Sequence, residues 1–161
     1  MKAELQKKIF EKYPKIFRDK GESPMKSLMC FGLDIGDGWY ELIDEMCSKL
    51  VAIEKVSGLV VIARQCKEKY GSLRFYNSIC FPQPFIGTIF FSKIIVKTRG
   101  YKAKAKQAAI WTNIAEDVIH CAENRSCYTC EDCGEYGKTR RSTGWHSTLC
   151  DKHAKERDYT D

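Results

Sequence analysis

The sequence lacks any long apolar run. No stretch of its 161 residues approaches the roughly 18 apolar residues that a membrane-spanning helix needs, so we expect no such helix. The opening MKAELQKKIF has no apolar segment followed by a small-residue cleavage site, so we expect no secretory signal. With 43% hydrophobic and 30% charged residues, the chain can form the core of one ordinary domain with a small appended module.

Familiar catalytic motifs are also missing. The chain contains no G-x-S-x-G, Walker or H-E-x-x-H motif. Gly36-Asp37-Gly38 lacks the further glycine and lysine of a phosphate-binding loop. A metal-dependent nuclease needs a histidine base and further histidine or asparagine groups, but His146 is the one such residue between Cys133 and Cys150. We therefore predict a protein that is not an enzyme, with a metal-dependent nuclease as the weaker alternative.

The nine cysteines are unevenly distributed. Their odd number and the missing signal peptide argue against an extracellular disulfide framework. Four of them lie singly among apolar neighbours, and we expect these to be reduced, buried thiols: Cys30, Cys47, Cys66 and Cys80.

The C-terminal cysteines have the spacing of a zinc site. Cys130-x2-Cys133 is followed by Gly134 and, after a gap of sixteen residues, by Cys150-x2-His153. Two short ligand pairs separated by about 15–20 residues are typical of structural zinc, because a hairpin in the gap can bring the pairs to one ion. Gly134 suits the tight turn after the first pair. The spacing predicts one structural Zn²⁺ per chain, in a closed site with no position for a catalytic water.

Two residues are alternatives for a ligand position. Cys127 forms a second C-x-x-C pair with Cys130, and its alternatives are a spare thiol, a redox-active neighbour and a ligand in place of His153. His146 is a rival for the fourth position, but its spacing from Cys150 is less usual. We prefer Cys130, Cys133, Cys150 and His153, because this set pairs two short knuckles symmetrically.

Apolar periodicity predicts an α+β fold with helices packed on a small antiparallel sheet. The expected elements are helices at 3–13, 38–55 and 103–124 and a hairpin at 58–80. Residues 81–96 are ambiguous between helix and strand. We expect an α+β domain at 1–126 and a zinc-ribbon-like module at 127–161.

Particular residues are expected to position these helices. Asp37 is a candidate N-cap of the second helix, and Trp39 is expected to anchor that helix in the core. The inward stripe of the third helix is expected to contain Ile110, Ile114, Val118 and Cys121.

Acidic residues are absent from 69 to 115, within a chain of net charge +6. Basic side chains in this region alternate with aromatic ones, including Lys69, Tyr70, Arg74 and Tyr76. Such a pattern favours a phosphate or single-strand surface, with a solvated face as the alternative. The module at 127–161 has six basic and seven acidic side chains and suits a protein contact equally well. Candidate contact residues are Lys93, Lys97, Arg99, Lys102, Lys104, Lys106 and, at the expected hairpin tip, Arg140 and Arg141.

Four segments resemble a group of uncharacterised bacteriophage proteins. They are GDGWYELI (36–43), KEKYGSLRFY (67–76), AE (115–116) and TCEDCG…GW…TLCDKHA (129–154). The chain departs from that group at His153, where a cysteine is usual, and at residues 80–102, which look like an insertion. The resemblance implies a phage-encoded accessory protein with a zinc module, in the cytoplasm of the infected host, and it implies no activity.

Macromolecular binding is the function that these observations favour. We expect binding of nucleic acid through residues 69–106, of a host protein, or of both. The alternative is an inhibitor that binds a host defence or transcription protein directly.

Overall fold

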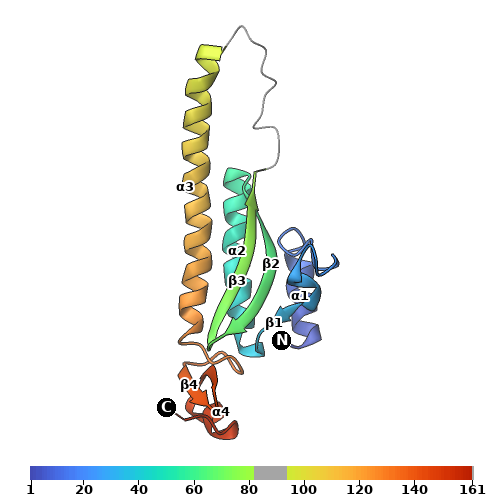
Figure 1. Ribbon diagram of the computed structural model, residues 1–161, viewed down its shortest axis with the longest axis vertical. Helices are drawn as coiled ribbons and strands as arrows, with labels where there is room; N and C mark the ends of the chain where they lie inside the picture. The colour runs from blue at the N-terminus through green and yellow to red at the C-terminus, as the bar shows by residue number, and fades with distance from the viewer. Residues whose placement is uncertain (82–93, 161) are drawn as a thin grey trace.

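The computed structural model describes residues 1–81 and 94–160, with the backbone alone described for 94–104. Figure 1 shows a helix-and-sheet body with a small module at one end that contains the C-terminus. The helices are α1 (Ala3–Lys12), α2 (Tyr40–Ser57), α3 (Ile94–Ser126) and α4 (Asp151–Glu156), with short 3-10 helices η1 (Leu28–Phe31) and η2 (Asp37–Trp39). The strands are β1 (Leu33–Asp34), β2 (Val60–Lys69), β3 (Ser72–Cys80), β4 (Lys138–Ser142) and β5 (Trp145–Leu149).

The α+β class is confirmed, although the main sheet is mixed and not purely antiparallel. Strands β2 and β3 form the predicted antiparallel hairpin, turning at Tyr70 and Gly71. Strand β1 joins β2 in parallel, with Leu33 opposite Cys66. The prediction missed β1 because a strand of two residues has no periodicity that a sequence pattern can display.

The packing of α3 corrects the predicted inward stripe. Ile110 is 49% exposed and Ile114 37%, and Cys121 is exposed as well. The buried positions are Ala115, Ile119, Ala122 and Ser126, with Val118 partly buried against the core. Small side chains allow α3 to lie close to its neighbours, and a search for the most apolar stripe overlooks them.

Helix α3 also covers the free edge of the sheet. The backbone N–H of Leu73 donates to Ser126 Oγ at 2.8 Å, and that of Phe75 donates to Glu123 Oε1 at 2.9 Å. Both donors lie on β3, whose other edge pairs with β2. Two side chains of α3 thus accept backbone N–H groups on an edge that would otherwise be open to pairing with another chain.

The start of α2 differs from the prediction. The N-cap residue is Trp39, which makes no side-chain cap, and Asp37 lies in η2. The Asp37 carboxylate accepts the backbone N–H of Lys2 at 2.7 Å and pairs with Lys2 Nζ at 3.1 Å. The bond from the Lys2 backbone N–H is the main cause of the lowered pKa of Asp37. Asp37 therefore holds the N-terminus, while Trp39 is fully buried as predicted.

The isolated cysteines are free thiols, and only some are as buried as expected. Cys47 and Cys66 are buried, and burial raises the pKa of both thiols. Cys30 and Cys80 are half-buried.

Candidate metal centre

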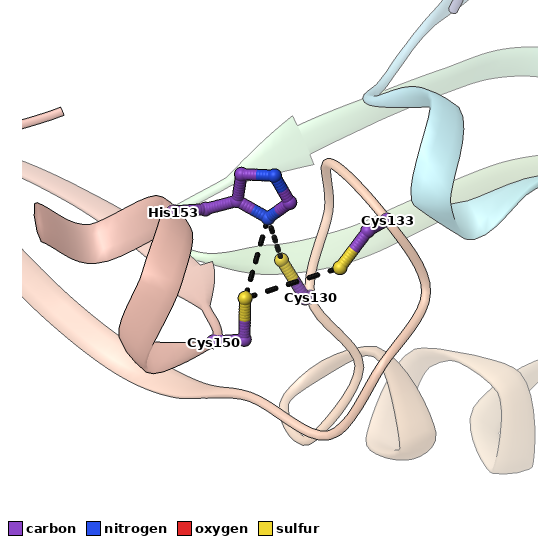
Figure 2. Close-up of side chains that lie close together, drawn as sticks. All are labelled: Cys130, Cys133, Cys150 and His153. Atoms are coloured by element: carbon purple, nitrogen blue, oxygen red, sulfur yellow. Dashed lines mark hydrogen bonds between the residues drawn. The ribbon is translucent and has the colours of Figure 1, made fainter. Parts of the chain in front are cut away.

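Four side chains converge in the C-terminal module. Cys130, Cys133, Cys150 and His153 place one ligand atom each within 4.8 Å of all the others (Figure 2). His153 Nδ1 lies 3.4 Å from Cys130 Sγ and 3.3 Å from Cys150 Sγ, and the sulfurs of Cys133 and Cys150 are 3.9 Å apart. Tetrahedral zinc with thiolate and imidazole ligands separates those atoms by about 3.3–3.8 Å. The group therefore fits a metal ion such as zinc.

The first ligand pair lies on a tight knuckle. The backbone N–H of Gly134 donates to the Cys130 carbonyl at 2.9 Å, which closes the turn around Cys133. Gly134 has φ +81°, in the left-handed region that glycine adopts without strain. The N–H of Cys130 donates to the Glu135 carbonyl at 2.7 Å and completes the loop. The glycine after the first pair thus has the role that its position predicted.

The second ligand pair lies on a helix and not on a second knuckle. Cys150 is the N-cap of α4, and His153 lies in its first turn. Residues three apart on a helix project from the same face, so this turn directs both side chains to one point. The predicted symmetry of two knuckles is therefore wrong, because Asp151 begins a helix at this position. The ligand spacing is the same in both arrangements.

The two alternative ligands lie outside the cluster. The Cys127 thiol donates to the Glu123 carbonyl at 3.7 Å, in the last turn of α3. The His146 ring makes an edge contact with the Tyr70 ring, with 6.1 Å between centroids. Neither residue belongs to the group of potential ligands found among the described residues.

The module has too small a core to be stable through apolar burial alone. Its fully buried apolar cluster consists of Cys130, Leu149 and Ala154, with Cys150 and Tyr159 partly buried against it. A core of this size is well below what a small domain needs without a metal, disulfides or docking to a larger body. The module thus depends on its ligand cluster and on its contacts with the rest of the chain.

A hydrogen bond lowers the pKa of one ligand thiol, and ion pairs link the two ligand-bearing segments. The backbone N–H of His153, at the start of α4, lowers the pKa of Cys150 to about 7. Beyond the end of α4, Arg157 pairs with Glu131 at 2.8 Å and with Asp132. Both acids belong to the knuckle, so Arg157 links the two ligand-bearing segments. Burial raises the pKa of Glu131, and Arg157 opposes that effect.

The segment before α2 packs directly on the knuckle. The backbone N–H of Gly38 donates to the Glu131 carbonyl at 2.8 Å, and Trp39 Nε1 donates to the Thr129 carbonyl at 2.7 Å. A Cβ on Gly38 would lie 2.3 Å from the Cys130 carbonyl oxygen, and one on Gly36 1.9 Å from that of Glu131. Both glycines are needed because backbone meets backbone here. The sequence of this motif predicts a helix start, but it does not predict this docking.

A second contact joins the module to the sheet. Thr148 Oγ1 donates to the Gly71 carbonyl at 2.6 Å, at the turn between β2 and β3. The candidate metal centre is therefore held against both the start of α2 and the tip of the main hairpin.

The candidate contact residues have different environments. Arg140 and Arg141 lie in β4, and the tip of that hairpin is Thr143-Gly144. The Arg140 guanidinium is buried, where it donates to the Leu149 carbonyl at 3.2 Å and pairs with Asp151, whereas Arg141 is exposed. Lys106 is exposed on α3. Lys97, Arg99, Lys102 and Lys104 lie where only the backbone of α3 is described, and Lys93 falls outside the described residues.

No protein-family model, curated protein or solved structure matches the chain. The resemblance to bacteriophage proteins thus finds no support in these comparisons. Among the described residues, no helix has the length and apolar character needed to cross a membrane.

Proposed function

We propose that the protein is a non-enzymatic nucleic-acid-binding protein whose C-terminal module is held by one structural Zn²⁺. The convergence of Cys130, Cys133, Cys150 and His153 carries the zinc part of this proposal. Four protein ligands would close the coordination sphere, which is the arrangement of structural and not of catalytic zinc. Zinc bound there would hold the knuckle and α4 together and present a firm surface to η2 and the hairpin tip.

Nucleic acid is the favoured partner because of the charge distribution. Residues 69–115 contain no carboxylate, and aromatic residues lie among the basic residues there. Phosphates attract such a surface, and exposed aromatic rings add base stacking. The motif resemblance is what suggests a phage-encoded accessory protein acting in the cytoplasm of an infected bacterium.

A host protein is the second candidate partner, and an exposed apolar segment favours it. Met25 is 95% exposed, and Phe31, at the end of η1, is 69% exposed. Leu28, between them in the sequence, is 38% exposed, so this short segment offers apolar side chains to a protein partner. Inhibition of a host defence or transcription protein would use such a segment.

Zinc content tests the structural part of the proposal. Elemental analysis of the purified protein should give about one zinc per chain, and Cys133→Ser should lose it. Cys127→Ser is the matched control, because this thiol is close in sequence but bonds to the Glu123 carbonyl. Zinc retained by Cys133→Ser, or lost equally from Cys127→Ser, would contradict the ligand assignment.

Binding to mixed-sequence DNA and RNA tests the partner. We expect mobility shifts at about 50 mM salt that weaken steeply as salt rises, since phosphate contacts release counterions. No shift at that salt, together with a stoichiometric protein captured from host lysate, would favour the second candidate. The weaker alternative, a metal-dependent nuclease, is tested by replacing both His146 and His153. If the double variant still cleaves nucleic acid, these histidines are not the basis of a nuclease.

A further inference from the structure

Between Gln65 and Tyr76, the hairpin β2–β3 has one face that no described helix covers. Directly opposed residues of an antiparallel pair point to the same side. Cys66 and Phe75 are opposed and buried, so their neighbours, Lys67 opposite Arg74, point to the other side. Figure 1 shows the hairpin in front of α2, and no helix crosses in front of the hairpin. We call this side the open face.

Basic side chains on the open face have no carboxylate partner. Lys67, Lys69 and Arg74 form no ion pair within the described part of the chain, and the Arg74 guanidinium donates to the Leu73 carbonyl. Asp34 is next to Lys67 in the register of β1 and β2, yet the two are not paired. Cations that no carboxylate neutralises are available to phosphates.

Exposed aromatic rings accompany these cations. Tyr76 is 46% exposed and Tyr70 is 70% exposed. Lys67 Nζ lies 5.7 Å from the Tyr76 ring centroid, and Lys69 Nζ lies 5.4 Å from that of Tyr70. In each pair the ammonium group lies over one face of the ring, so a base would stack on the other face, with the lysine beside it for a phosphate. Single-stranded nucleic acid uses this combination of stacking and charge.

A groove beside Tyr76 extends the open face. It has a volume of about 790 Å³ and lies between residues 19–28 and the hairpin. Gln65 and Ser78 supply hydrogen-bonding groups to its lining. Its two acids have their own partners, since Asp19 pairs with Arg64, and Glu22 with Lys26 at 3.0 Å. The groove therefore adds polar groups for a base edge without adding unpaired negative charge.

We infer that the open face binds single-stranded nucleic acid, with phosphates on Lys67, Lys69 and Arg74 and a base stacked on Tyr76 at the mouth of the groove. This inference rests on the proposed function and assigns the contact to the sheet in place of the start of α3. Single strands fit better than a duplex, because an unpaired base is needed to reach the Tyr76 ring.

Fluorescence anisotropy with labelled 12-nucleotide oligo(U), oligo(dT) and a mixed-sequence duplex tests the inference on the full zinc-loaded chain. Tyr76→Ala should weaken single-strand binding by about 5- to 100-fold, whereas Tyr76→Phe should bind as the wild type does. Tyr136→Ala is the matched control, because that ring is more exposed but lies in the module.

The charge test compares two double variants of equal net charge. Lys67→Gln with Arg74→Gln should reduce the magnitude of the slope of log affinity against log salt by about 1.4, since each single-strand phosphate contact contributes about 0.7. Lys8→Gln with Lys55→Gln, at exposed lysines outside the face, should leave the slope unchanged. Circular dichroism and thermal melting verify that each variant is folded.

The outcomes separate the inference from the proposed function. The wild type could bind nucleic acid while Tyr76→Ala and the double variant at Lys67 and Arg74 weaken binding no more than their controls do. That result would overturn the assignment of the contact to the open face and leave nucleic-acid binding standing. Preference for the duplex, with no effect of Tyr76→Ala, would overturn the single-strand assignment. No binding of any probe at about 50 mM salt would overturn both. Oligo(U) and oligo(dT) distinguish RNA from DNA.

Discussion

The contact between Gly38 and the knuckle allows a sharp test of how the candidate metal centre is coupled to the rest of the chain. In Gly38→Ala, the new Cβ would lie 2.3 Å from the Cys130 carbonyl oxygen, 2.4 Å from Gly134 N and 2.6 Å from Cys133 N. All three atoms belong to the backbone, so no side chain can rotate away to make room. The start of α2 and the knuckle must therefore separate.

The expected cost follows from two effects. Overpacking a tight contact costs about 1–3 kcal/mol. Separation also weakens the hydrogen bond from Gly38 N–H to the Glu131 carbonyl, a further 0.5–1.5 kcal/mol or so. We expect Gly38→Ala to lower the free energy of unfolding of the zinc-loaded protein by about 2–4 kcal/mol. Gly21→Ala is the control, because a Cβ there meets nothing within 4 Å, and its effect should stay below about 0.5 kcal/mol.

Urea unfolding monitored by tryptophan fluorescence measures this cost, with and without a chelator. Coupling between two sites is reciprocal, so a contact that depends on the zinc-bound knuckle must also support zinc binding. A cost of about 2 kcal/mol in that contact should raise the zinc dissociation constant about 30-fold in a competition assay. Equal unfolding midpoints for Gly38→Ala and Gly21→Ala with zinc bound would refute the steric argument. An equal loss with and without chelator would refute the coupling.

Two further predictions concern α3. Ser126→Ala should cost about 1–3 kcal/mol in urea unfolding, because it leaves the buried N–H of Leu73 without its acceptor; Asn124→Ala, on the exposed side of the helix, should cost less than about 0.5 kcal/mol. Hydrogen bonds from Lys49 and, second in size, from Arg125 lower the pKa of Glu45 to about 2. The stability that these contacts give the folded protein is complete above the unfolded pKa of 4.5 and is lost as pH falls toward 2. Glu45→Gln should remove this pH dependence, with an effect below about 1 kcal/mol because Glu45 is 42% exposed; an unchanged acid profile of stability would contradict it.

The ligand cluster was predictable because its chemistry leaves a local signature. Spacing of three between ligands places both on one turn, whether the turn is a knuckle, as at Cys130, or the first turn of a helix, as at Cys150. The same invariance explains why the spacing could not tell a helix from a second knuckle. Long periodic elements such as α2 and the β2–β3 hairpin were predictable for the same reason, since each carries its pattern within its own residues.

Features that depend on distant partners were not predictable. Asp37 has the residue type of an N-cap, but Lys2, far away in the sequence, takes its carboxylate. Judged by hydrophobicity alone, the isoleucines Ile110 and Ile114 of α3 should face inward. In the folded chain the side with Ala115 and Ala122 is buried, since small side chains permit close approach to α2 and β3. In both cases a local preference lost to a contact that the chain forms only after folding.

The charge pattern shows the same limit in a way that bears on function. Basic and aromatic residues of 69–106 were predictable as a group, and the densest part, from Lys97 to Lys106, was the natural first choice for a nucleic-acid contact. Density along the chain measures proximity in sequence, whereas a binding surface requires proximity in space. The strand register puts Lys67 opposite Arg74 and leaves Tyr76 exposed on the same side. Strand pairing thus gathers alternate residues of both strands on one face, including Lys67, which lies outside the acid-free region. We therefore assign the contact to the sheet.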